Sequence, residues 1–138
     1  MFVIEKTFRF EAAHHLNGLA EDHRCANTHG HSYAVVVELA SPVLDDDGFV
    51  TDFADLDLLG DYVKTVLDHR YLNELRATSA DGADAGPLLP QPTCEHLARH
   101  LYETAARVLP SGLAALVSAV QVSETANTRA TYLPQRAR

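Results

Sequence analysis

The chain has 138 residues, of which 46% are hydrophobic, and carries a formal net charge of −8 at pH 7. This length predicts one domain spanning residues 1–138, with a core that needs no disulfide staples. The negative charge argues against nucleic-acid binding, and no apolar run approaches the roughly 20 residues of a membrane-spanning helix. Two cysteines and an N-terminus without a signal-peptide pattern favour a reducing, cytoplasmic location.

The N-terminal segment is predicted to be a strand that ends at His14. The residues that share one face of this strand are Phe8, Phe10, Ala12 and His14. A polar loop over residues 17–27 follows. A second strand is predicted over residues 31–39, which are rich in β-branched side chains, and His29 and His31 are in phase with its apolar residues.

Two helices are predicted in the middle of the chain. Asp52 marks the start of the first helix, and apolar residues at helical spacing continue to Leu67. Thr93 is expected to cap the second helix, whose apolar face extends to Val108. Residues 76–92 are rich in Ala, Asp, Gly and Pro, and are predicted to form one long loop.

The C-terminal part is predicted to add two more strands. The third lies around Val120 and Val122, and the fourth lies over residues 128–133. Together these elements predict an α+β fold in which a four-stranded antiparallel sheet carries two helices on one face. Glu124 interrupts the apolar face of the third strand, and an inward carboxylate needs donor groups to accompany it.

Three histidines and a cysteine are the strongest chemical signal in the chain. His29 and His31 project from one face of an extended segment, and Gly30 between them lets the backbone approach a neighbour closely. If His14 joins them, the site would bind zinc through three nitrogens and keep one coordination position open. The alternative is a closed structural site in which Cys25 is the fourth ligand.

An ordered set of short motifs spans nearly the whole chain. These motifs are Phe10-Glu11-Ala12-Ala13-His14, Cys25 with His29-Gly30-His31, Asp52-Phe53, Leu67-Asp68-His69 with Tyr71-Leu72-Asn73, Pro92-Thr93, and Glu124-Thr125. The set resembles the 6-pyruvoyltetrahydropterin synthase and 6-carboxytetrahydropterin synthase family. The short gap between Cys25 and His29 is typical of the bacterial carboxy enzymes. Two positions depart from the family pattern, since Cys94 replaces a common serine and Ser123 replaces a common lysine.

The resemblance implies a fold, a metal and a reaction. The fold is the tunnelling fold, in which the sheets of several subunits join into a barrel and two trimers stack into a homohexamer with active sites at subunit interfaces. The metal is Zn²⁺, held by His14, His29 and His31. The expected reaction converts 7,8-dihydroneopterin triphosphate to 6-carboxy-5,6,7,8-tetrahydropterin, acetaldehyde and triphosphate, in the biosynthesis of 7-deazapurines such as queuosine precursors.

The resemblance also assigns proton-transfer roles. Cys25 is expected to act as a general base that lies near the metal without binding it. His69, oriented by Asp68, is expected to manage a second proton transfer. Because adjacent residues on a helix do not face one another, this pair requires the helix to end near Leu67. The alternative for the pair is an ordinary Asp and His on a solvated helix end.

Substrate binding is assigned to Glu124 and Thr93. A carboxylate can accept the two parallel N–H donors of a pterin, and this matches the substrate anchor of the family. The enzymatic alternative is 6-pyruvoyltetrahydropterin synthase, which keeps the carbon side chain. A dihydroneopterin-cleaving enzyme is disfavoured because such relatives replace the cysteine with glutamate. A zinc-stabilised pterin-binding module without activity would not need Cys25, Asp68 and His69.

Overall fold

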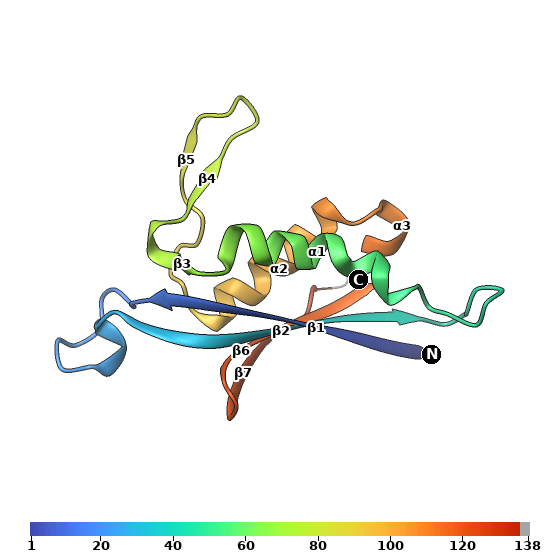
Figure 1. Ribbon diagram of the computed structural model, residues 1–138, viewed down its shortest axis with the longest axis horizontal. Helices are drawn as coiled ribbons and strands as arrows, with labels where there is room; N and C mark the ends of the chain where they lie inside the picture. Colours follow the sequence, from blue (N-terminus) through green and yellow to red (C-terminus); the bar gives the residue numbers. More distant parts are fainter. Residues whose placement is uncertain (136–138) are drawn as a thin grey trace.

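A five-stranded sheet forms one layer of the computed structural model, which describes residues 1–135 (Figure 1). Its strands, in the spatial order β3-β1-β2-β6-β7, are β1 Phe2–His14, β2 His29–Ser41, β3 Arg70–Tyr71, β6 Val117–Thr125 and β7 Thr128–Tyr132. Four of them pair antiparallel as predicted, whereas β3 runs parallel to β1. The prediction of four strands missed β3 because a two-residue strand shows no periodic pattern.

The register of β1 and β2 places the histidines. Phe2 pairs with Ser41 at one end of this long hairpin, and His14 pairs with His29 at the other. His29 and His31 therefore share a face with the buried Val35, as their phase predicted.

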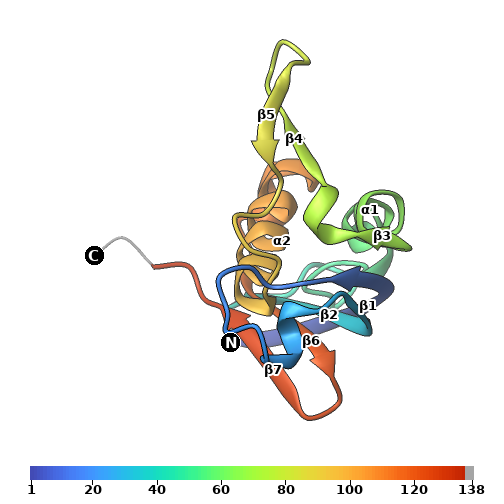
Figure 2. The same cartoon turned by 90° about the vertical axis from the view of Figure 1, so that its left-hand side faces the viewer.

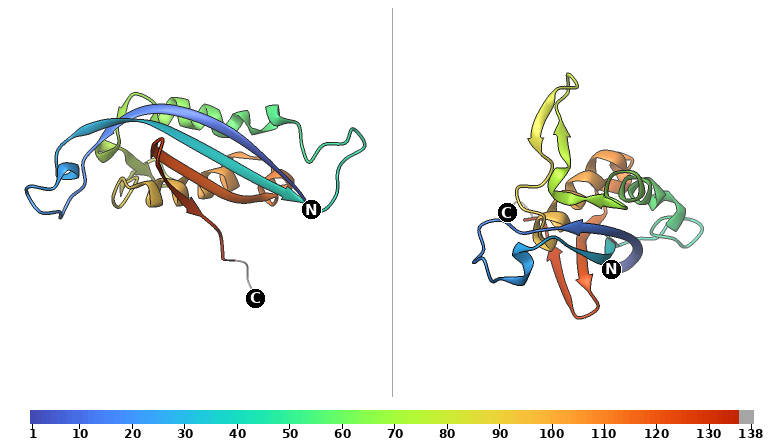
Figure 3. Two further views of the ribbon diagram at one scale, coloured as in Figure 1. Left: turned by 90° about the horizontal axis from the view of Figure 1, so that it is seen from below. Right: turned by 60° about the vertical axis from the view of Figure 1, so that its left-hand side comes forward.

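Helical segments cover this face of the sheet (Figure 3). They are a 3₁₀ turn Phe53–Leu56, α1 Asp57–Tyr62, a π-helical turn Val63–Leu67, α2 Cys94–Val108 and the short α3 Ser111–Ala114. The Asp52 carboxylate accepts a hydrogen bond from the Ala54 N–H, and Thr93 Oγ1 accepts one from the His96 N–H, so both predicted helix starts are confirmed. No helix within residues 1–135 is long and apolar enough to cross a membrane.

Burial of branched apolar side chains between the helices and the sheet forms the core. Fully buried residues from both layers are Val35, Val37, Leu39, Leu56, Leu59, Leu67, Leu97, Leu101, Val120 and Val122. Phe10 and Tyr33 stack across β1 and β2 with their ring centroids 4.7 Å apart. This stack lies between the apolar core and the histidine end of the sheet, so it gives the histidines a rigid support.

The predicted loop over residues 76–92 contains a β-hairpin, so that prediction was wrong in part. Strands β4 Arg76–Thr78 and β5 Asp84–Pro87 project away from the main sheet and the helices (Figures 1 and 2). Gly82 supplies a positive φ of 85° at the tip, and Arg76 forms an ion pair with Asp84 at 3.0 Å. Polar contacts hold this hairpin, and the alternation of apolar residues that identifies a buried strand is therefore missing.

Candidate metal centre and active site

His14, His29 and His31 form a compact group at the end of the β1–β2 hairpin. Their ligand nitrogens all lie within 4.8 Å of one another, and the Nε2 atoms of His14 and His29 are 3.0 Å apart. Three imidazole nitrogens at this spacing can hold a metal ion. The proximity of the three side chains follows from the strand register, since His14 lies opposite His29 and Ala12 lies opposite His31.

Hydrogen bonds occupy the Nδ1 atoms of His14 and His29 and leave their Nε2 atoms available to a metal. His14 Nδ1 is 2.7 Å from the Pro92 carbonyl oxygen, and His29 Nδ1 is 2.6 Å from the Asn27 carbonyl oxygen. A carbonyl can only accept, so each Nδ1 carries the proton and each Nε2 keeps its lone pair. His31 Nε2 is buried and has no hydrogen-bond partner among the described residues. A metal ion would satisfy this otherwise costly nitrogen.

Burial favours the neutral form of two of the three rings. Burial lowers the pKa of His14 and of His31, which favours the uncharged imidazole that binds a metal. The carboxylate of Glu124 opposes this effect, because its Oε2 lies 3.7 Å from His31 Nε2 and 3.9 Å from His14 Nε2. That negative charge also favours a cation at the same position.

Cys25 lies beside the histidine group. It belongs to a 3₁₀ turn, Arg24–Ala26, whose cap is His23, and the Cys25 N–H donates to His23 Nδ1 at 3.1 Å. Together with His29 and His31 it lines a cavity of about 730 Å³. Its Sγ is not among the mutually close ligand atoms found within residues 1–135. The thiol therefore lies beside the histidine group in this structure.

Asp68 and His69 face each other because the helix ends immediately before them. The π-helical turn stops at Leu67, and His69 adopts a positive φ of 58°. Two contacts with β1 hold this turn: the Glu11 N–H donates to Asp68 Oδ1 at 2.8 Å, and the His69 N–H donates to the Glu11 carbonyl at 2.6 Å. Asp68 Oδ2 lies 3.0 Å from His69 Nδ1. Hydrogen bonds lower the pKa of Asp68; the bond from the Glu11 N–H has the largest effect, and the bond with His69 has the second largest. An ionised Asp68 carboxylate therefore orients the His69 ring.

Within residues 1–135, Cys25 and His69 line different cavities. His69 lines a separate space of about 450 Å³ with Glu11 and Ser32. The two cavities share Gly30 and His31 in their walls.

Glu124 and Thr93 line a third cavity of about 280 Å³ at the N-terminus of α2. Sequence reasoning missed the role of Cys94 in this cavity. Burial, followed by the negative charge of Glu124, raises the pKa of the Cys94 thiol to about 12, so the thiol stays protonated beside that carboxylate. Cys94 and Glu124 are 30 positions apart in the sequence, so no local pattern indicates that they line the same cavity.

Comparison with known proteins identifies relatives over the full length. A protein from Synechocystis sp. named 6-carboxy-5,6,7,8-tetrahydropterin synthase is 35% identical over 141 residues, covering 99% of this chain and 96% of the relative. A protein of the same name from Bacillus subtilis is 32% identical, covering 98% of this chain and 87% of the relative.

The fold has a solved counterpart. The 6-pyruvoyl tetrahydropterin synthase of Caenorhabditis elegans superposes with a TM-score of 0.76 and 25% identity, covering 97% of this chain and 96% of that one. This likeness confirms the predicted tunnelling fold. The family model for 6-pyruvoyl tetrahydropterin synthase matches residues 3–135. With three histidines grouped where the motif predicted them, the chain belongs to the 6-pyruvoyl tetrahydropterin synthase family.

Proposed function

We propose that the protein is a zinc-dependent 6-carboxy-5,6,7,8-tetrahydropterin synthase. The substrates are 7,8-dihydroneopterin triphosphate and one water molecule, and the products are the carboxylated tetrahydropterin, acetaldehyde and triphosphate. The observation that carries this proposal is the convergence of three histidine nitrogens in a chain whose relatives bear this enzyme's name. Hydrogen bonds fix a lone pair on two of these nitrogens, and the third, His31 Nε2, has no hydrogen-bond partner among the described residues.

The residues divide the chemistry among them. Zinc held by His14, His29 and His31 would polarise the side-chain oxygens of the substrate and acidify the adjacent C–H. Cys25 removes that proton as a general base. His69 transfers the second proton, and Asp68 fixes its ring through the 3.0 Å contact at Nδ1.

Glu124 anchors the pterin ring in this proposal. Its carboxylate accepts the 2-amino and ring N–H groups, while Thr93 lines the same cavity. Glu124 holds the pterin ring, and the metal histidines lie at the side-chain end of the substrate. The reacting carbon is fixed between them, which lowers the entropic part of the activation free energy.

The active site is proposed to be completed between subunits of a homohexamer. Cys25 and His69 line different cavities of one chain, which supports a site that draws them from two chains. β1 pairs with β3 at Ala12 and Ala13, and within residues 1–135 no strand pairs with the rest of this edge, which supports pairing with another subunit there. We place the enzyme in the cytoplasm, where its product would enter 7-deazapurine biosynthesis of the queuosine type.

Product analysis tests this proposal. Zinc-loaded protein is incubated with 7,8-dihydroneopterin triphosphate, the pterins are identified by mass spectrometry, and acetaldehyde is trapped as a hydrazone. We expect equimolar 6-carboxy-5,6,7,8-tetrahydropterin and acetaldehyde. A pyruvoyl product without acetaldehyde would favour the activity named for the Caenorhabditis elegans protein. Binding without turnover would identify a pterin-binding module instead.

A further inference from the structure

Two side-chain amides extend β1 beyond its last residue. The Asn73 amide pairs with both backbone groups of His15: the His15 N–H donates to Asn73 Oδ1 at 2.9 Å, and Asn73 Nδ2 donates to the His15 carbonyl at 2.9 Å. The Gln91 amide pairs with Asn17 in the same way: the Asn17 N–H donates to Gln91 Oε1 at 3.1 Å, and Gln91 Nε2 donates to the Asn17 carbonyl at 2.9 Å. Each amide therefore satisfies the N–H and C=O groups that a neighbouring strand would otherwise satisfy.

The other edge of the same segment is bonded to Cys25. The Leu16 N–H, which points away from the two amides as strand alternation requires, donates to the Cys25 carbonyl at 2.8 Å. Residues 15–17 are thus held between the Asn73 and Gln91 amides on one side and the Cys25 turn on the other. A shift of this segment would move the Cys25 turn with it.

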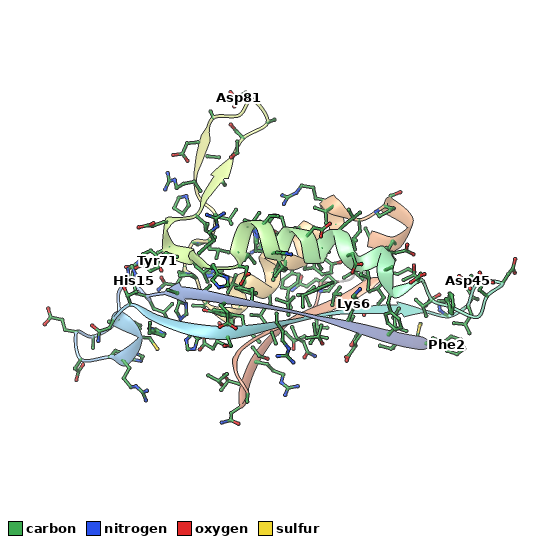
Figure 4. All side chains as sticks on the ribbon, in the orientation of Figure 1. Phe2, Lys6, His15, Asp45, Tyr71 and Asp81 are labelled. Atoms are coloured by element: carbon green, nitrogen blue, oxygen red, sulfur yellow. The ribbon has the colours of Figure 1, made fainter. Side chains whose placement is uncertain are left out.

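The side chain of His15 adds a third link. Its Nε2–H donates to Asn17 Oδ1 at 2.8 Å, which leaves Nδ1 to accept from the Tyr71 hydroxyl. The Tyr71 oxygen also lies 3.2 Å from Thr28 Oγ1, at the far end of the loop that carries Cys25. Figure 4 shows His15 and Tyr71 side by side at the end of β1. Both ends of the loop therefore contact the segment that follows α1.

We infer that Asn73 and Gln91 are positioning residues that set the location of the Cys25 thiol relative to the metal histidines. The inference rests on the proposed role of Cys25 as the general base. Neither amide contacts a histidine of the metal group in the hydrogen bonds found over residues 1–135, so they act through the backbone of residues 15–17. Without them, this segment would lose its partners on one edge while His14 stayed within β1.

The test replaces each amide by the isosteric acid. In Gln91→Glu the carboxylate still accepts from the Asn17 N–H, but it cannot donate to the Asn17 carbonyl and repels it. Asn73→Asp makes the same change at His15, and Gln121→Glu on β6 adds an equal charge away from the segment as the matched control. We expect kcat of both amide variants to fall about ten- to a hundredfold, the range for a misplacement near 1 Å. KM and zinc content should stay at the wild-type values.

A double-mutant cycle with Cys25→Ala shows whether the amides act through the thiol. Gln91→Glu should lower kcat in the wild-type background and leave the residual rate of Cys25→Ala unchanged. Amide hydrogen exchange of residues 15–28, followed by mass spectrometry, should be faster in Gln91→Glu than in Gln121→Glu.

The inference is overturned by an unchanged kcat in Gln91→Glu despite faster exchange, by an equal loss in the Cys25→Ala background, or by a loss of zinc in parallel with kcat. If Asn73→Asp does not fold, Gln91→Glu decides alone. A near-normal kcat for Cys25→Ala is a different failure: it would remove the proposed role of Cys25, and with it the premise of the inference.

Discussion

The side chains around Glu124 determine what its carboxylate can bind. Its carboxylate lies near the Nε2 atoms of His14 and His31 and lines one cavity with the protonated Cys94 thiol. About 30% of its side chain is exposed, so one flank stays open to a ligand. A partly exposed carboxylate with free acceptor oxygens is suited to receive a pair of N–H donors.

Replacing Glu124 with glutamine should weaken pterin binding. The Gln amide offers one acceptor and one donor, so one pterin N–H would face another N–H in a desolvated cavity. Charge-assisted hydrogen bonds contribute about 1.5–3 kcal/mol each, which predicts at least about a tenfold loss of affinity. Calorimetric titration of the zinc-loaded protein with a non-reacting pterin measures this loss.

Glu95→Gln is the control for that titration, because Glu95 lines the same cavity from the first turn of α2. We expect wild-type affinity for this variant. Equal affinities for wild type and Glu124→Gln would mean that the pterin is held by other residues.

At the scale of elements, α1 packs unusually closely on β1. A Cβ added at Gly60 would meet Cε1 of the Phe8 ring at 2.6 Å and Cδ1 at 2.8 Å. These separations are shorter than van der Waals contact, so either the ring or the helix must move. A glycine in the middle of a helix is therefore retained here for space and not for backbone freedom.

Gly60→Ala should destabilise the fold although alanine is the better helix former. Overpacking costs about 1–3 kcal/mol, whereas the helix gains only about 0.5–1 kcal/mol. The free energy of unfolding, measured by urea denaturation, should fall by up to about 2.5 kcal/mol from the balance of these two terms. Gly112→Ala in α3 is the matched control, since no atom lies within 4 Å of its added Cβ, and it should be neutral or stabilising. A stabilised Gly60→Ala would show that Phe8 moves aside without cost.

The elements that sequence patterns predicted well are those with a strong period or a capping residue. β1, β2 and the two helix starts were recognised because alternating apolar residues, Asp52 and Thr93 carry local signals. β3 and the β4–β5 hairpin were missed because backbone and polar contacts form them.

The candidate site also combines features that local sequence patterns predict with features that they do not predict. The histidines could be grouped from their phase and their motif, and the need for a helix end near Leu67 could be stated in advance. The amide contacts of Asn73 and Gln91, and the cavity that Cys94 shares with Glu124, join distant parts of the chain. Only the folded chain reveals such pairs, because nothing in the neighbouring residues specifies the partner.

At the scale of the whole molecule, the proposed division of the active site between subunits makes a quantitative prediction. Cys25→Ala and His69→Ala should each be nearly inactive alone. In hexamers reassembled from an equal mixture, each site independently receives an intact Cys25 and an intact His69, so about a quarter of wild-type activity should return. Steady-state turnover before and after reassembly measures the recovery. No recovery in mixed hexamers would place both residues of a site in one chain.

The amide contacts at both ends of the β4–β5 hairpin also have an evolutionary consequence. Asn73 precedes this hairpin and Gln91 follows it, and each is fastened to the residues that follow β1. The intervening stretch projects from the body of the molecule (Figure 2), and a change in loop length between fixed ends costs little free energy. Insertions and deletions in the hairpin can therefore accumulate among descendants of this chain, because both anchor points keep the loop that carries Cys25 in register whatever the length of the hairpin between them.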